Sequence, residues 1–166
     1  MVKRILGVLL IASGLICGVY FLFFRNNDEL AIKKQLNDLA YLASKNLNEK
    51  TTVSIIKNQS LQKIFAPQCE LSFGINMFDG VFSNLQLVNS ISQANMYLQS
   101  SSIKAEDIEI FLIDETYAEA DFIGEFKGRS KSGEYIEEVR ALSAKLQKLD
   151  GEWVIYSISI QRVLEK

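Results

Sequence analysis

The sequence predicts an α+β domain, in which helices come first and a long bent antiparallel sheet wraps them, preceded by one transmembrane helix. An uncharged apolar run covers Ile5–Phe24. Helical apolar spacing follows it, and strands with alternating apolar residues, separated by turn dipeptides, are the main pattern from Ala118 onward. Helices followed by a run of strands are typical of α+β domains, with the helices packed on the sheet.

The run Ile5–Phe24 is expected to be an uncleaved anchor, with residues 1–4 as a tail and 25–27 as a linker. At about 1.5 Å per residue, a helix of this length spans roughly 30 Å of hydrocarbon. A cleaved signal peptide has a shorter apolar core that ends at a small-x-small site. A lipoprotein needs a small residue before its cysteine, whereas Ile16 precedes Cys17.

Charges around the run favour a cytoplasmic N-terminus in a bacterial cell membrane. Lys3 and Arg4 precede it, although Arg25 follows it and weakens the asymmetry. The domain is therefore expected on the periplasmic or extracellular side. One helix face carries small residues that can pack against a second membrane helix, although glycine is also frequent in membrane helices generally. These are Gly7, Gly14 and Gly18.

Residues 28–166 form the predicted domain, which begins with a helix capped by Asn27 or Asp28. Its apolar positions repeat at helical spacing: Ile32, Leu36, Leu39, Ala40, Ala43 and Leu47. Lys50–Gln59 fits no element. A short helix is expected over Leu61–Ala66, capped by Ser60 and ended by Pro67.

The middle of the domain predicts one short strand and a second helix. The strand covers Cys69–Phe73, Asp79-Gly80 makes a turn, and the helix covers Leu85–Leu98 without an interrupting glycine or proline.

An antiparallel meander is predicted for the last third of the chain. Ile103–Ile113 is apolar and β-branched. The three strands of the meander follow it: Ala118–Lys127, Tyr135–Leu149 and a final one from Val154, joined by the turns Ser132-Gly133 and Asp150-Gly151. The apolar phase shifts within Tyr135–Leu149, which predicts a β-bulge.

This order of elements resembles the nuclear-transport-factor-2-like superfamily, which includes polyketide-cyclase-like, ketosteroid-isomerase and scytalone-dehydratase families. The resemblance covers about residues 28–164. It rests on a short helix ending in Phe65-Ala66-Pro67 and on the Leu149–Trp153 turn between long strands. It implies a cone-shaped domain with a pocket between sheet and helices, and pairing of two copies through the sheet. Enzymes of the superfamily use an aspartate base, a tyrosine or acid oxyanion donor, or an Asp–His pair.

The residues favour no catalytic, metal or cofactor site. The chain has no histidine and two cysteines, Cys17 and Cys69. Asp121 and Tyr156 remain as candidates for a catalytic acid and for a hydrogen-bond donor to an oxyanion. Alternation with Ala120 and Phe122 places Asp121 on the wet face, and Tyr156 shares the apolar phase of its strand. Adjacent acidic pairs point to opposite strand faces and cannot share a metal.

Aromatic side chains are the candidates for lining a pocket, with filling of the core as the alternative. They are Phe73, Phe82, Tyr97, Phe122, Phe126 and Tyr156. An apolar small molecule is the ligand that such a pocket implies. Nucleic acid is not an expected partner, because all 20 acidic residues follow the anchor and leave the domain with a net charge of −5.

The predicted function is a single-pass, membrane-anchored, non-catalytic binding or assembly module. Its expected partners are the membrane, through Ile5–Phe24, and a second copy or a larger protein complex. One alternative is a pocket enzyme of isomerase or cyclase type that acts on a hydrophobic substrate. Another is a scaffold subunit resembling the small periplasmic scaffold of type IV secretion systems.

Overall fold

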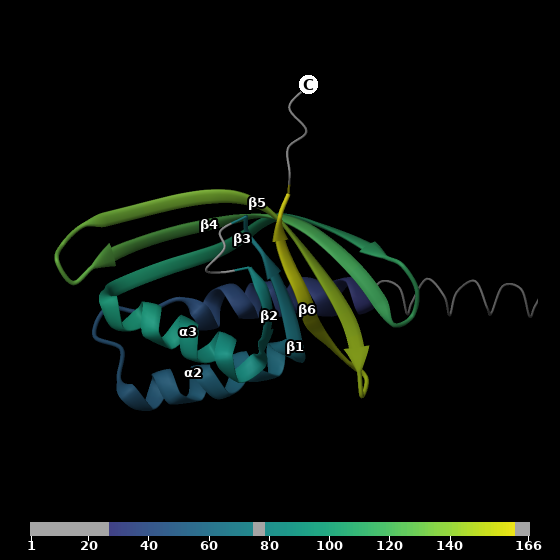
Figure 1. Ribbon diagram of the computed structural model, residues 1–166, viewed down its shortest axis with the longest axis horizontal. Helices are drawn as coiled ribbons and strands as arrows, with labels where there is room; N and C mark the ends of the chain where they lie inside the picture. Colours follow the sequence, from purple (N-terminus) through teal and green to yellow (C-terminus); the bar gives the residue numbers. More distant parts are fainter. Residues whose placement is uncertain (1–26, 75–78, 162–166) are drawn as a thin grey trace, which may run out of the picture.

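The computed structural model describes residues 27–74 and 79–161 (Figure 1). A first helix covers residues 27–43. The remaining elements are α2 (Thr51–Ile64), β1 (Phe65–Ser72), β2 (Gly80–Ser83), α3 (Asn84–Tyr97), β3 (Leu98–Leu112), β4 (Tyr117–Ser130), β5 (Tyr135–Leu149) and β6 (Glu152–Ile160). This order confirms the predicted α+β class.

The predicted anchor Ile5–Phe24, with Gly7, Gly14 and Gly18, lies outside the described residues. In the part of the chain that the structure does describe, no helix has the length and apolar character needed to cross a membrane.

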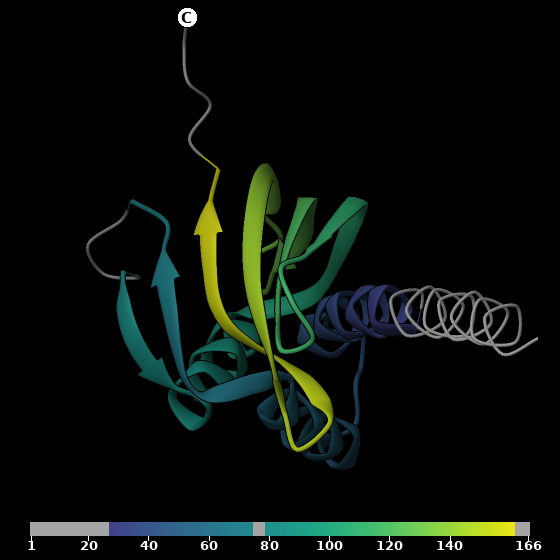
Figure 2. The same ribbon diagram turned by 90° about the vertical axis from the view of Figure 1, so that its right-hand side faces the viewer.

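All six strands form one sheet in the order β2-β1-β6-β5-β4-β3. The strands pair antiparallel except β1 and β6, which are parallel. The long strands β3, β4 and β5 curve over the helices, so that the sheet has a concave face covered by helices and a convex outer face (Figures 1 and 2). The last of the described strands, β6, thus lies in the interior of the sheet, between β1 and β5.

Alternation along β4 separates the two faces as predicted. Ala118, Ala120 and Phe122 are buried and point toward the helices. On β5 they face Leu146, Ala144 and Leu142 across an unbroken register. Small side chains at the middle of this face let the helices approach the sheet closely.

The first helix packs its predicted apolar face against the sheet. Ile32 and Leu36 are at most 1% exposed and belong to the same core cluster as Leu146 and Ile155. The helix ends at residue 43, so that Leu47, which was expected on the buried face, is 60% exposed instead.

The predictions for residues 50–67 were wrong in their bounds: the expected helix Leu61–Ala66 is helical only to Ile64, and Ser60 lies inside a helix instead of capping one. A single helix, α2, replaces the unassigned stretch and the short helix, and Phe65-Ala66-Pro67 opens β1 instead of ending a helix. The residues that α2 buries are Lys57, Leu61 and Ile64. Because a lysine occupies the buried face while three apolar side chains of α2 are exposed, apolar spacing does not mark this helix. The exposed ones are Val53, Ile55 and Ile56.

The predicted bulge is not in β5: one bulge lies in the adjacent strand β6, and another lies in β3 at the edge of the sheet. In β3, Asp107 is an extra residue with a φ of 51° between the pairs at Glu106 and Glu109. In β6, Tyr156 is the extra residue opposite the step from Lys145 to Leu146. Bulges bend a strand and increase its twist, which suits a sheet that wraps helices.

Candidate ligand cavity

A cavity of about 300 Å³ lies between the helices and the concave face of the sheet. The first helix contributes Leu36, Leu39, Ala40 and Ala43, and α3 contributes Leu87, Ser90 and Ile91. On the sheet side, β1 contributes Phe65 and Leu71, and Phe73 follows just after that strand. The long strands contribute the rest: Ile103, Lys104 and Ala105 from β3, Phe122 and Gly124 from β4, Leu142 from β5 and Ile158 from β6.

Small side chains leave the space open. Ala40 faces the sheet from the first helix, and Ala105 and Gly124 are cross-strand partners on β3 and β4. A Cβ added at Gly124 would lie 2.8 Å from Leu142 Cδ1. Any side chain at position 124 would therefore push Leu142 from its place in the cavity wall.

Hydrocarbon makes up almost the whole lining. Ser90 and Lys104 are the only residues with polar side chains among the lining residues that the structure describes. The Lys104 ammonium turns to the outer surface, where its Nζ lies 3.4 Å from Glu125 and 3.6 Å from Glu106. A ligand in the cavity therefore meets apolar contacts, with no carboxylate among the lining residues to act as a general base.

Two of the six aromatic residues predicted to line a pocket, Phe73 and Phe122, line this cavity. Phe73 is held at the end of β1 because its backbone N–H donates to Asp79 Oδ1 at 2.6 Å. Most of the lining is aliphatic and was not singled out from the sequence. The periodicity of the first helix identifies its buried face, which includes Leu36, but it does not separate a cavity wall from a packed core.

The other four aromatic residues lie elsewhere. Phe82 packs against the core cluster from β2, and Phe126 is half-buried on β4. Tyr97 is 77% exposed at the end of α3. Tyr156 packs edge-to-face against Tyr117, with ring centroids 6.3 Å apart.

Asp121 lies on the opposite face of β4 from the cavity. Its cross-strand partners are Ser143 on β5 and Glu109 on β3, whereas Ala120 and Phe122 on either side of it point inward. This placement agrees with the wet-face expectation and keeps the carboxylate away from a ligand in the cavity.

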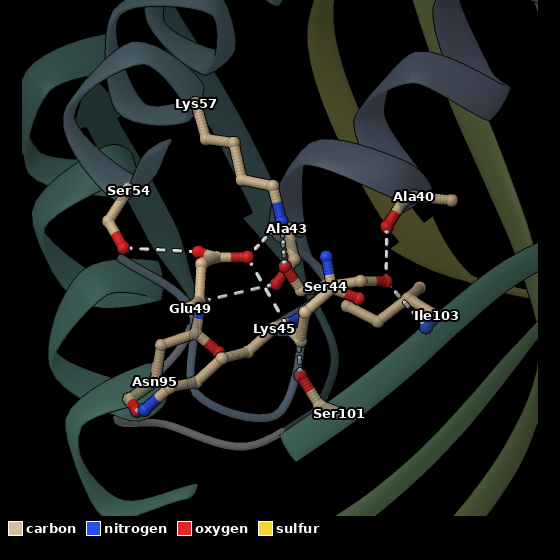
Figure 3. Close-up of polar contacts among 11 residues, drawn as sticks. Ala40, Ala43, Ser44, Lys45, Glu49, Ser54, Lys57, Asn95, Ser101 and Ile103 are labelled. Carbon is tan, nitrogen blue, oxygen red and sulfur yellow. Dashed lines mark hydrogen bonds and ion pairs between the residues drawn. The ribbon is translucent and has the colours of Figure 1, made fainter. Parts of the chain in front are cut away.

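A buried ion pair joins the loop after the first helix to α2 (Figure 3). Lys57 Nζ donates to Glu49 Oε2 at 2.5 Å and to the Ser44 carbonyl at 2.9 Å, and both charged side chains are 6% exposed. Burial alone raises the pKa of Glu49. Hydrogen bonds from Lys57, Asn46 and Ser54, together with the charge of Lys57, outweigh burial and hold the pKa of Glu49 below its ordinary value.

Further polar contacts fix the ends of the first helix and α3 against β3. Lys45 Nζ donates to the carbonyls of Asn95 and Leu98 at 2.6 and 2.7 Å, and Asn95 Nδ2 donates to the Ala43 carbonyl at 3.2 Å. Ser44 Oγ accepts from the Ile103 N–H at 2.8 Å (Figure 3). The contacts of Lys45 and Asn95 satisfy carbonyls at helix ends that would otherwise be unpaired.

Within residues 27–74 and 79–161, the structure shows no candidate metal site. No group of three or more histidine, cysteine, aspartate or glutamate side chains comes together there. Every buried side-chain nitrogen and oxygen atom of these ranges has a hydrogen-bond partner.

Comparison with solved structures identifies the fold. No protein-family model matches the sequence, and neither does any curated protein. A protein described as a candidate scytalone dehydratase from Novosphingobium aromaticivorans superposes with a TM-score of 0.66 at 15% identity, covering 84% of this chain and 87% of that one. The hexachlorocyclohexane dehydrochlorinase LinA-type3 from Novosphingobium barchaimii gives 0.63 at 13% identity, with 84% and 88% covered. The Kfla4162 protein from Kribbella flavida gives 0.67 at 10% identity, with 86% and 95% covered.

These likenesses show that the chain has the nuclear-transport-factor-2-like fold that its sequence resembles. At this level of identity they show the fold alone, because one fold carries many functions.

Proposed function

We propose that the domain binds a hydrophobic small molecule in the cavity between the helices and the sheet. The observation that carries this proposal is the cavity itself, which is lined almost wholly by hydrocarbon. Its volume of about 300 Å³ is at the lower end of the range of ligand pockets, roughly 300–1,000 Å³. Burial of apolar ligand surface contributes about 25 cal/mol per Å² to the binding free energy.

Chemical conversion of that molecule is the second candidate function. The scytalone dehydratase and dehydrochlorinase names of two structural neighbours favour a pocket enzyme over a module that only assembles with other proteins. The lining favours binding without conversion, because Ser90 and Lys104 are its only polar side chains. Incubation of the protein with each bound hydrophobic compound, followed by mass spectrometry of the compound, separates the two functions.

Cavity filling tests the shared part of both proposals. Gly124→Ala forces Leu142 to shift and should weaken binding of a cavity ligand about tenfold, which corresponds to about 1.4 kcal/mol. Gly128→Ala is the matched control on the same strand, since its added Cβ would also meet a neighbour at 2.8 Å, the Phe126 ring, away from the cavity lining. Equal affinity of the two variants for hydrophobic probes, measured by native mass spectrometry, would contradict the proposal.

Membrane attachment through Ile5–Phe24 is a separate proposal, supported by the length and the uncharged composition of that run. The full chain should stay in the membrane pellet after alkaline carbonate extraction, and a variant lacking Ile5–Phe24 should be released. In the proposed orientation, protease added outside the membrane digests the domain. Release of the full chain would contradict the anchor, and protection from external protease would contradict the orientation.

A further inference from the structure

A second hollow lies beside the cavity, between the first helix and the outer edge of β3. Its volume is about 410 Å³. It shares four lining residues with the cavity: Ala40, Ile103, Lys104 and Ala105. The two hollows are therefore adjacent, and we call the four shared residues their junction. We call the second one the edge groove.

Polar contacts bound this junction at one end. Ser44 Oγ accepts from the Ile103 N–H at 2.8 Å, and Lys45 and Ser101 exchange both of their backbone hydrogen bonds at 2.8 and 3.1 Å. Ala40 and Ala105 line both hollows further along the same helix and strand, and their side chains are small.

The edge groove differs from the cavity because it offers hydrogen-bonding groups. Tyr41 and Ser102 line it, and neither hydroxyl has a hydrogen bond to another described residue. Ser101 directs its N–H and C=O toward Lys45, so that regular alternation along β3 directs those of Ala105 to the same outer edge.

Charge in the edge groove is compensated. Lys104 and Glu106 both line it, and Lys104 Nζ lies 3.6 Å from Glu106 and 3.4 Å from Glu125. The groove therefore holds no unpaired cation among the described residues that line it to attract an anionic group. A polar but uncharged group fits it best.

We propose that the ligand is a single-chain amphiphile, with its hydrocarbon chain in the cavity and an uncharged, hydrogen-bonding head, such as an alcohol, in the edge groove. This inference rests on the proposed function and extends it by naming the chemical class of the ligand. Its central observation is the junction at Ala40 and Ala105 between an apolar hollow and a polar one.

Two photoreactive medium-chain alcohols test the orientation on the full chain in lipid nanodiscs. One carries a diazirine at the end of its chain, and the other carries it next to the hydroxyl. The first should label cavity residues such as Leu87 and Leu142, and the second should label Tyr41 and Ser102. Identical labelling by both probes would overturn the inference.

Variants locate the head group. Tyr41→Phe removes an exposed hydroxyl, so it should weaken the alcohol several-fold and leave an alkane of equal length unaffected. Ala105→Leu obstructs the junction and should reduce labelling by both alcohols at least tenfold. Ala141→Leu is its control, because Ala141 lies opposite Ile123 on the convex face. Thermal melting by circular dichroism establishes that each variant is folded.

Competition separates this inference from the function on which it rests. Each competitor is added during labelling by the photoreactive alcohols. If an alkane reduces the labelling as strongly as an alcohol of equal length, the inference of an amphiphilic ligand is overturned, and a hydrophobic cavity ligand remains. If the fatty acid of equal length binds more tightly than the alcohol, the inference that the head group is uncharged is overturned. Failure of every apolar competitor would overturn the proposed function itself.

Discussion

The Glu49–Lys57 pair shows how a buried charge can be held in a small domain. Both side chains are 6% exposed, and hydrogen bonds from Asn46 and Ser54 also reach the carboxylate. The Lys57 ammonium also lies 5.3 Å from the centre of the Tyr41 ring. Desolvation of both charges is costly, so that such a pair is favourable only while both partners are present.

Removal of one partner should therefore be expensive. Lys57→Met leaves the Glu49 carboxylate buried and unpaired, and we expect a loss of about 3–5 kcal/mol in the free energy of unfolding, measured with urea. The double variant Lys57→Met/Glu49→Met should recover most of that loss. Lys34→Met is the control, because the Lys34–Asp38 pair is exposed and should contribute under about 1 kcal/mol. Equal losses for Lys57→Met and Lys34→Met would contradict this role.

Acid should weaken the same pair. The lowered pKa of Glu49 means that the unfolded chain binds the proton more readily than the folded one. Its contribution is complete above the ordinary glutamate pKa of about 4.3 and is lost as the pH falls through the lowered pKa. Glu49→Gln should flatten this part of the stability curve between pH 5 and the acid transition, as followed by urea unfolding at each pH. An unchanged slope would argue against the pairing.

Cys69 should be inert while the domain is folded. The side chain is 0% exposed, and burial, with a smaller contribution from the charge of Glu70, raises its pKa to about 12. In a Cys17→Ser background, we expect no measurable reaction with a thiol-specific disulfide reagent at pH 8 over minutes. Rapid reaction should follow in urea. Fast labelling without urea would place Cys69 on an accessible surface.

At the scale of elements, the start of the first helix is tied to the hairpin between β5 and β6. Asp28 Oδ1 accepts from Trp153 Nε1 at 2.9 Å and from Lys148 Nζ at 2.7 Å. Trp153 is 4% exposed, and the Lys148 ammonium also lies 5.3 Å from the centre of its ring. An aspartate in the first turn of a helix is also favourable for the helix dipole.

Loss of this tie should destabilise the domain. Asp28→Ala leaves a buried indole N–H without its acceptor, which costs about 1–3 kcal/mol. Asp28→Asn retains an oxygen acceptor and should lose less. Asp38→Ala on the same helix removes only an exposed ion pair and should change the free energy of unfolding by under about 1 kcal/mol. Chemical unfolding of the three variants measures the order, and equal losses would show that the tie contributes nothing.

Sequence patterns predicted the elements whose buried faces are regularly apolar. They missed the short strand β2 and most of α2, whose buried face includes a lysine. Alternation along β4 gave both of its faces, since Ala118, Ala120 and Phe122 are all buried. The missed helix, α2, buries Lys57. That lysine can be buried because Glu49 and the Ser44 carbonyl accept hydrogen bonds from its ammonium group. Neither acceptor belongs to α2, so the sequence of the helix does not reveal them.

At the scale of the whole molecule, the cavity could be expected from the resemblance, but its wall could not be derived from any single segment. Its space depends on small residues that three different elements bring together: Ala40, Ala105 and Gly124. No local pattern distinguishes these from small residues in a packed core. Only Phe73 and Phe122 of the predicted aromatic residues line the cavity. An apolar residue can be buried by packing against its neighbours without facing an open space, and the sequence pattern does not distinguish the two cases.

Pairing of two copies through the convex face stays a prediction, and sedimentation of residues 28–166 tests it. Phe111 and Tyr117 on that face are 51% and 42% exposed. We expect a dimer that dissociates on dilution and that Phe111→Lys weakens at least tenfold. Tyr97→Lys, an exposed change at the end of α3, should leave it intact. A monomer at every concentration would contradict the pairing.

The central position of β6 determines when the domain can first exist during synthesis. Until Glu152–Ile160 leave the ribosome, β1 with β2 and the β3–β5 meander are separate half-sheets with unsatisfied edges. The parallel pairing of β1 with β6 joins segments far apart in sequence, and such contacts form slowly. A nascent chain therefore needs protection of these edges from aggregation until β6 has been made and has paired with its neighbours. A message truncated before β6 would yield no ligand cavity, since Ile158 completes its wall.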